Sequence, residues 1–127
     1  MYKGIDVSQW QGNIDWKKVA AAGIDFAIIR SLRGSLKTDP YFENNFKGAR
    51  ENGIAIGIYK YSYATDVDFA KKEAEAIIKL LAGRKVEAKI WFDIEDECQK
   101  DLDKNLLFNI IKIFLDTIKA AGYDVGI

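Results

Sequence analysis

Histidine is absent from this 127-residue chain, and cysteine, methionine and proline occur only once each. Without histidine, the chain cannot form a Ser-His-Asp or Cys-His nucleophile arrangement or a histidine-containing zinc site. The single cysteine, Cys98, excludes an internal disulfide bond. Its acidic neighbours are typical of an incidental thiol rather than a nucleophile. Acid–base chemistry is therefore left to Asp, Glu, Lys and Tyr side chains.

An excess of charge and a long apolar run are also missing. The 19 Lys and Arg residues balance the 19 Asp and Glu residues, so nothing indicates a nucleic-acid partner. No run approaches the roughly 18 apolar residues of a membrane span, and the opening "MYKGIDVSQ" lacks a signal-peptide core. We therefore expect a single domain over residues 1–127, with no nucleic-acid or membrane partner, no cofactor and no signal peptide in this chain.

One pattern recurs along the chain, in which a helical stretch ends at a glycine and a β-rich run follows. A glycine at this place supplies the positive φ that a helix C-terminus needs. The runs are dense in Ile, Val, Phe and Tyr, as buried strands are. Alternating βα units predict a parallel sheet, either an open doubly wound sheet or a βα barrel. The absence of a GxGxxG or P-loop motif disfavours a nucleotide-binding open sheet. The four glycines are Gly23, Gly53, Gly83 and Gly122.

Helix starts and core-facing stripes can also be predicted. Asp39 before Pro40 is typical of a capping residue followed by the first helical position. Asp66 or Asp68 is expected to cap the next helix. Two later helices carry apolar residues at helical spacing, which predicts that these residues face the core. The stripes are Ala70, Ala74, Ile77, Ile78 and Leu81 in one helix, and Leu107, Ile110, Ile111, Phe114 and Ile118 in the other.

Acidic residues gather where two strand-like segments end. Alternation in "AKIWFDIEDE" places Trp91, Asp93 and Glu95 on one face. In "GIDVSQWQG", Asp6 lies on the face opposite to Ile5 and Val7. Asp6 alone has two interpretations, a loop cap or the wall of a pocket. The three carboxylates together favour a pocket, because active sites of βα folds lie at the carboxyl ends of the strands.

The pair Asp93 and Glu95 is suited to glycoside hydrolysis. Like charges two residues apart on a strand raise one pKa and keep one carboxyl protonated. Such a reaction needs a proton donor and a second carboxylate, and nearby aromatic side chains suit sugar faces. An alternative is that Asp93, Glu95 and Asp96 bind a divalent cation, which the aromatic neighbours disfavour. We therefore expect no metal.

Four segments resemble, in order, those of the glycoside hydrolase family 25 lysozymes, the Chalaropsis-type muramidases. "GIDVSQWQG" resembles the family's first strand and loop, and "FAIIRSLRGSLKTDPYFENNFKGARENGI" its second strand and helix. "IGIYKYSYA" resembles the third strand, and "IWFDIED" the fourth strand with its Asp-x-Glu motif. The resemblance covers essentially the whole chain.

The resemblance implies a TIM-like (β/α)5(β)3 barrel that cleaves the β-1,4 bond between N-acetylmuramic acid and N-acetylglucosamine in peptidoglycan. It implies that Glu95 is the general acid. It also implies that Asp93 stabilises positive charge or orients the acetamido group, and that Asp6 completes the acidic cluster. The protein would act on the bacterial cell wall, either extracellularly or after release by a phage. The residues expected to bind the glycan are Trp10, Arg30, Tyr59, Tyr61 and Tyr63.

Three departures from the family pattern affect these expectations. Arg30 stands where the second strand usually ends in Lys, which keeps the charge and changes the geometry. Lys60 stands where the family usually has His, and its expected direction, away from Tyr59 and Tyr61, predicts little effect on the chemistry. The barrel's last three strands would follow "YDVGI", so we expect a domain truncated within its fifth strand that self-associates through open strand edges. The alternative function is a catalytically weak fragment that binds cell-wall carbohydrate.

Overall fold

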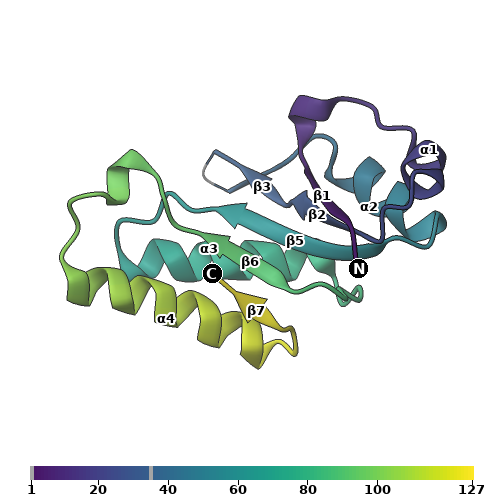
Figure 1. Cartoon of the computed structure of the whole chain (residues 1–127). Coiled ribbons are helices and arrows are strands. Elements are labelled where there is room, and N and C mark those ends of the chain that lie inside the picture. The colour runs from purple at the N-terminus through teal and green to yellow at the C-terminus, as the bar shows by residue number, and fades with distance from the viewer. Residues whose placement is uncertain (1, 35) are drawn as a thin grey trace.

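The computed structural model describes residues 2–34 and 36–127, in which a parallel sheet is flanked by helices (Figure 1). None of the helices in this part of the chain has the length and apolar composition to cross a membrane. The main sheet contains β1 (Gly4–Val7), β2 (Phe26–Arg30), β5 (Ala55–Tyr61), β6 (Ile90–Asp93) and β7 (Val125–Gly126), and β3 (Leu32–Arg33) and β4 (Lys37–Thr38) form a separate antiparallel hairpin. The helices are α1 (Trp16–Ala21), α2 (Phe42–Glu51), α3 (Val67–Leu81) and α4 (Lys104–Ala120), and two short 3-10 helices are η1 (Gln9–Gln11) and η2 (Glu97–Gln99).

The order of strands in the main sheet is β1-β2-β5-β6-β7, and every neighbouring pair is parallel. Each strand of this sheet therefore pairs with the next one along the chain. A doubly wound sheet reverses direction at a switch point, so the structure excludes that alternative. The predicted parallel α/β fold is confirmed, whereas closure into a barrel stays a prediction. Among the described residues, β1 pairs only with β2 and β7 only with β6, and self-association through these edges also stays a prediction.

The two faces of the sheet differ sharply in burial, because successive side chains of a strand point to opposite faces. On one face, the side chains of β2, β5 and β6 are at most 1% exposed and pack against helices; the ring centroids of Phe92 and Phe114 of α4, for example, lie 3.8 Å apart. On the other face, Phe26, Ile28 and Trp91 are only partly buried. The helices thus cover one face and leave the other open. The apolar residues of these three strands on the covered face are Ala27, Ile29, Ile56, Ile58, Ile90 and Phe92.

The predicted helix ends are confirmed in most places. Gly23, Gly53, Gly83 and Gly122 all have positive φ, from 71° to 90°. Asp66 caps α3, where its Oδ1 accepts a hydrogen bond from the Phe69 amide at 2.7 Å. 

The predicted apolar stripes are confirmed only in part. In α3, Ala70, Ala74, Ile77 and Leu81 are buried, and Ile78 is half-buried. In α4, Ile110, Phe114 and Ile118 are buried as expected. Leu107 and Ile111 are half-buried and line a cavity, so assigning them to the core was wrong. Helical spacing identifies the apolar face of a helix. It does not show which residues of that face other elements of the fold cover.

The prediction that Asp39 caps a helix beginning at Pro40 was wrong. Helix α2 begins at Phe42, and Asp39 is only 1% exposed. Its Oδ2 accepts hydrogen bonds from Arg30 Nε at 2.7 Å and from the Gln9 amide at 3.0 Å, and Oδ1 accepts one from the Tyr41 amide at 2.8 Å. A buried carboxylate requires partners of this kind. Asp39 therefore ties the end of β2 to η1.

Candidate active site

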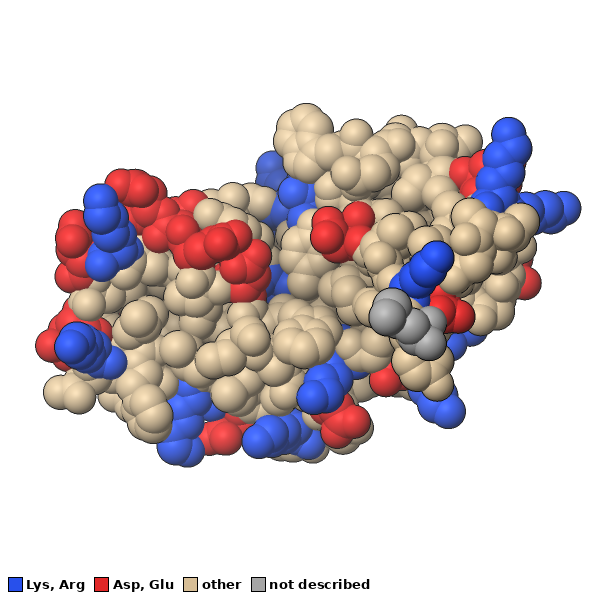
Figure 2. Space-filling view, in the orientation of Figure 1, with Lys and Arg blue, Asp and Glu red and all other residues tan. Residues whose placement is uncertain are grey.

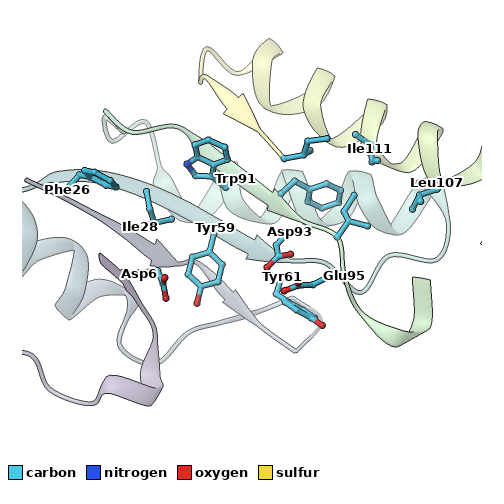
Figure 3. A pocket seen from close by; sticks show the side chains of 13 residues that line it. Asp6, Phe26, Ile28, Tyr59, Tyr61, Trp91, Asp93, Glu95, Leu107 and Ile111 are labelled. Atoms are coloured by element: carbon cyan, nitrogen blue, oxygen red, sulfur yellow. The ribbon is translucent and has the colours of Figure 1, made fainter. Parts of the chain in front are cut away.

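A cavity of about 1000 Å³ lies over the open face of the sheet and extends to Phe92 and to residues of α4 (Figure 3). It combines an apolar floor with acidic and aromatic side chains contributed by β1, β2, β5, β6, the segment after β6, and α4. Three predicted catalytic residues and two predicted glycan-binding tyrosines come together here. The lining residues are Asp6, Phe26, Ile28, Tyr59, Tyr61, Trp91, Phe92, Asp93, Ile94, Glu95, Leu107, Ile111 and Ile127.

The floor exists because glycines on neighbouring strands leave room for large side chains. A Cβ atom at Gly57 would lie 2.4 Å from Cδ1 of Ile28 and 2.7 Å from the Ala88 carbonyl oxygen. A Cβ atom at Gly126 would lie 2.7 Å from the Trp91 ring. Glycine inside a strand often marks such a close approach. Ile28 and Trp91 thereby form an apolar base beneath the acidic end of the cavity.

Asp93 and Glu95 form the carboxylate pair that the spacing predicts. Asp93 ends β6 and is partly buried, whereas Glu95 two residues later is exposed. Burial raises the pKa of Asp93 above its ordinary value, and the negative charge of Glu95 and a hydrogen bond with Glu95 raise it further. Asp93 therefore holds its proton to higher pH than an isolated aspartate would.

Asp6 lies across the cavity from this pair, with Tyr59 between them (Figure 3). The loop after β1 is capped by Ser8, whose Oγ accepts a hydrogen bond from the Trp10 amide at 3.2 Å, while Gln11 Oε1 accepts one from the Ser8 amide. The geometry therefore supports the pocket interpretation of Asp6. On this face, an isolated acidic group lies over β1 and a larger acidic cluster lies over the segment after β6, with a hollow between them (Figure 2).

Tyr61 is held by Asp96, an acid for which the sequence indicates only the alternative role of cation ligand. Its hydroxyl donates to Asp96 Oδ1 at 3.1 Å, while Asp96 Oδ2 accepts the Cys98 amide at 3.1 Å and caps η2. Burial and the hydrogen bond to Asp96 raise the pKa of Tyr61 to about 12, so its hydroxyl stays a donor. The hydrogen bond to Asp96 and burial raise the pKa of the Cys98 thiol, in agreement with an unreactive thiol. Within residues 2–34 and 36–127, no group of three or more acidic, cysteine or histidine side chains is arranged to hold a metal ion.

A smaller hollow of about 170 Å³ adjoins the cavity and shares Tyr59 and Tyr61 with it. Predicted glycan-binding residues Arg30 and Tyr63 line this second hollow, and the ring centroids of Tyr61 and Tyr63 lie 5.3 Å apart. Trp10 is 77% exposed and belongs to neither lining. Its role in glycan binding stays a prediction. The hairpin β3–β4, which the sequence pattern did not indicate, supplies the remaining wall through Leu32, Arg33 and Gly34.

Replacing Asp93 by Asn is expected to stabilise the protein at neutral pH and not at acidic pH. The pKa of Asp93 is raised on folding, so its favourable contribution is complete below the unfolded value of roughly 3.9 and is lost as pH rises through the folded value. The gain in Tm at pH 7 should be on the order of 2 °C, because solvent screens this partly exposed group.

Thermal melting at pH 3 and pH 7 measures this effect. Asp101→Asn, at an exposed turn position, is the matched control and should show no such pH dependence. Equal effects of Asp93→Asn at both pH values would contradict the assignment.

Comparison with known proteins agrees with this geometry. The model of glycosyl hydrolases family 25 matches residues 5–127. The autolytic lysozyme of Clostridium acetobutylicum is 28% identical over 123 residues, which is 97% of this chain and 36% of that protein. The uncharacterized protein YegX of Escherichia coli K12 is 34% identical over 103 residues, which is 68% of this chain and 38% of that protein. The chain thus spans well under half the length of these relatives.

Solved structures show the same fold. The modular autolysin LytC of Streptococcus pneumoniae, solved in complex with a synthetic peptidoglycan ligand, superposes with a TM-score of 0.85 at 32% identity. That match covers 98% of this chain and 31% of LytC. A bacterial lysozyme of Streptomyces coelicolor matches with a TM-score of 0.77 at 26% identity, over 94% of this chain and 58% of that protein. From its first strand to its last residue, the chain belongs to glycoside hydrolase family 25.

Proposed function

We propose that this domain acts as a lysozyme, cleaving the β-1,4 bond between N-acetylmuramic acid and N-acetylglucosamine in the peptidoglycan of bacterial cell walls. The observation that carries the proposal is the pair Asp93 and Glu95 facing Asp6 across an aromatic cavity. Membership of the family and the likeness to LytC, which binds a synthetic peptidoglycan ligand, support it.

The carboxylate pair supplies the proton for the reaction. Glu95 is the longer and more exposed member, and it delivers the proton to the glycosidic oxygen of the leaving sugar. Asp93 shares this proton in the resting state, as its raised pKa indicates. Once the proton has left, both carboxylates carry negative charge beside the positively charged sugar ring. Asp93 then stabilises that charge or orients the acetamido group, and Asp6 adds negative potential from the opposite wall.

The aromatic side chains provide the glycan-binding surface. Tyr59 and Tyr61 line both the cavity and the second hollow, so a glycan strand crossing them contacts both spaces. Trp91 adds an apolar surface at the floor of the cavity, and its indole nitrogen is already occupied by a hydrogen bond to the Ala88 carbonyl at 2.9 Å. Arg30 lies in the second hollow and offers a fixed positive charge near the tyrosines.

Digestion of purified cell walls tests the proposal. Turbidity loss measures hydrolysis, and reduction of the products with borohydride identifies the new reducing end. Muramic acid at the reducing end is expected, because the bond on its reducing side is cleaved. A glucosamine reducing end would contradict the proposed bond. Binding to cell walls without new reducing ends would favour the carbohydrate-binding alternative, and inhibition by a chelator would indicate a metal.

A further inference from the structure

A buried ion pair that the proposed chemistry does not use lies beneath the tyrosine wall, which consists of Tyr59, Tyr61 and Tyr63. Lys60 of β5 and Glu73 of α3 are both 0% exposed, and Lys60 Nζ lies 3.3 Å from Glu73 Oε2. Lys60 points to the covered face of the sheet, away from Tyr59 and Tyr61, as strand parity predicts. Burying two charges costs several kcal/mol per ion unless further hydrogen bonds satisfy them. The further partners of both groups are therefore informative.

Glu73 holds the chain that follows β5. Its Oε1 accepts a hydrogen bond from Ser62 Oγ at 2.8 Å, and its Oε2 accepts one from the Tyr63 amide at 3.1 Å. Gln99 of η2 joins the same network, because its Nε2 donates to Ser62 Oγ at 3.1 Å and to the Ala64 carbonyl at 3.0 Å. One carboxylate thus connects α3, the segment after β5 and η2.

Lys60 extends the network toward the hairpin β3–β4. Its Nζ donates to the carbonyl oxygens of Tyr61 and of Gly34, the latter at 3.5 Å, and lies 5.2 Å from the centroid of the Tyr63 ring. Gly34, Tyr61 and Tyr63 all line the second hollow. Three residues that line the hollow therefore contact the same buried ammonium group, that of Lys60.

The network also reaches the acidic residues. The Ser62 amide donates to the Asp93 carbonyl at 2.8 Å. Asp96, which caps η2, accepts the hydroxyl hydrogen bond of Tyr61. A displacement of the segment after β5 would therefore move the tyrosine wall and the backbone of Asp93 together. Hydrogen-bonded networks of this kind rigidify a site when their members are satisfied. Here both carboxylate oxygens of Glu73 and the Nε2 group of Gln99 have partners, whereas the buried Oε1 atom of Gln99 has none among the described residues.

We propose that Lys60 and Glu73 are positioning residues that hold the tyrosine wall and the segment after β6 in register for glycan binding. The pair acts through Ser62, Tyr63 and Gln99 and touches no sugar. This conclusion departs from the sequence-based expectation that Lys60 has little effect. The enzymatic part of its test rests on the proposed function, whereas the structural part does not.

Ser62→Ala is the sharpest test, because it cuts the link between Glu73 and Gln99 and leaves the ion pair intact. Glu73→Gln removes the buried charge as a second variant. Cys98, the only thiol of the chain, is exposed in η2 beside Gln99 and reports on this link without any catalysis. Both variants are expected to speed the reaction of Cys98 with Ellman's reagent by about fivefold and to raise KM on cell walls by a similar factor. The effect on kcat should be smaller, since binding is what the wall provides.

Two control variants separate positioning from plain stability. Thr117→Ala removes a hydroxyl hydrogen bond to the Ile113 carbonyl within α4, and Glu43→Gln breaks the ion pair with Arg84 at 2.8 Å. These controls are expected to change only Tm, which should fall or stay the same. Their rate of reaction with Ellman's reagent and their KM should equal those of the wild-type protein. The proposal is overturned if Ser62→Ala behaves like the controls. It is equally overturned if Glu73→Gln folds and shows the thiol reactivity and KM of the wild-type protein. If the wild-type protein has no hydrolytic activity, the thiol rates still decide this inference, and only the proposed function fails.

Discussion

Glu95→Gln is expected to reduce turnover on cell walls by about 10²–10⁴-fold, the usual loss when a general acid is removed. The amide keeps the shape of the side chain and cannot donate the proton to the leaving oxygen. Glycan binding should persist, because the tyrosine wall is unchanged. Initial rates of turbidity loss measure the turnover, and cell-wall pull-down at matched protein concentration measures binding.

Glu97→Gln is the matched control for this prediction. Glu97 is an acid two residues further on in η2, and its side chain is 88% exposed. It faces no part of the cavity lining, so its loss should leave turnover near wild type. If Glu95→Gln kept more than half of the wild-type turnover, Glu95 would not be the acid, and Asp93 would become the next residue to test.

Asp6→Asn is expected to lower turnover by about 10²-fold, comparable with the loss of one charge-stabilising group in other active sites, while Tm stays near wild type. The negative charge of Asp6 faces the carboxylate pair across the cavity, where positive charge develops on the sugar. Stability should be preserved because Ser8, rather than Asp6, caps η1. Activity and thermal melting are measured on the same sample.

Asp15→Ala should show the opposite behaviour. Asp15 caps α1, where its Oδ1 accepts a hydrogen bond from the Lys18 amide, and loss of a capping side chain typically costs about 1 kcal/mol. This control should melt earlier with unchanged specific activity. A large drop in Tm for Asp6→Asn with unchanged activity would instead show that Asp6 is structural.

Local rules were enough to predict the parallel α/β fold class and the gathering of Asp6, Asp93 and Glu95 at one cavity. The parity of a strand places Asp93 and Glu95 on one face, and positive φ requires glycine after each of the four helices. Both depend only on neighbours a few residues away. The resemblance of four motifs then added the family, which the match over residues 5–127 confirms.

The tertiary structure alone decided features that depend on contacts between distant segments. Asp39 has the local signature of a helix cap, and its Oδ1 does accept the Tyr41 amide, yet α2 begins only at Phe42. Its Oδ2 is buried against Arg30, a charge partner that the local pattern does not reveal. Strand parity predicts only that Lys60 points away from the cavity. The tertiary structure shows that it forms a buried ion pair with Glu73 of α3. The raised pKa of Asp93 likewise depends on burial, which the sequence does not show. The sequence by itself thus determined which side chains face which way, and packing determined which of them meet and at what electrostatic cost.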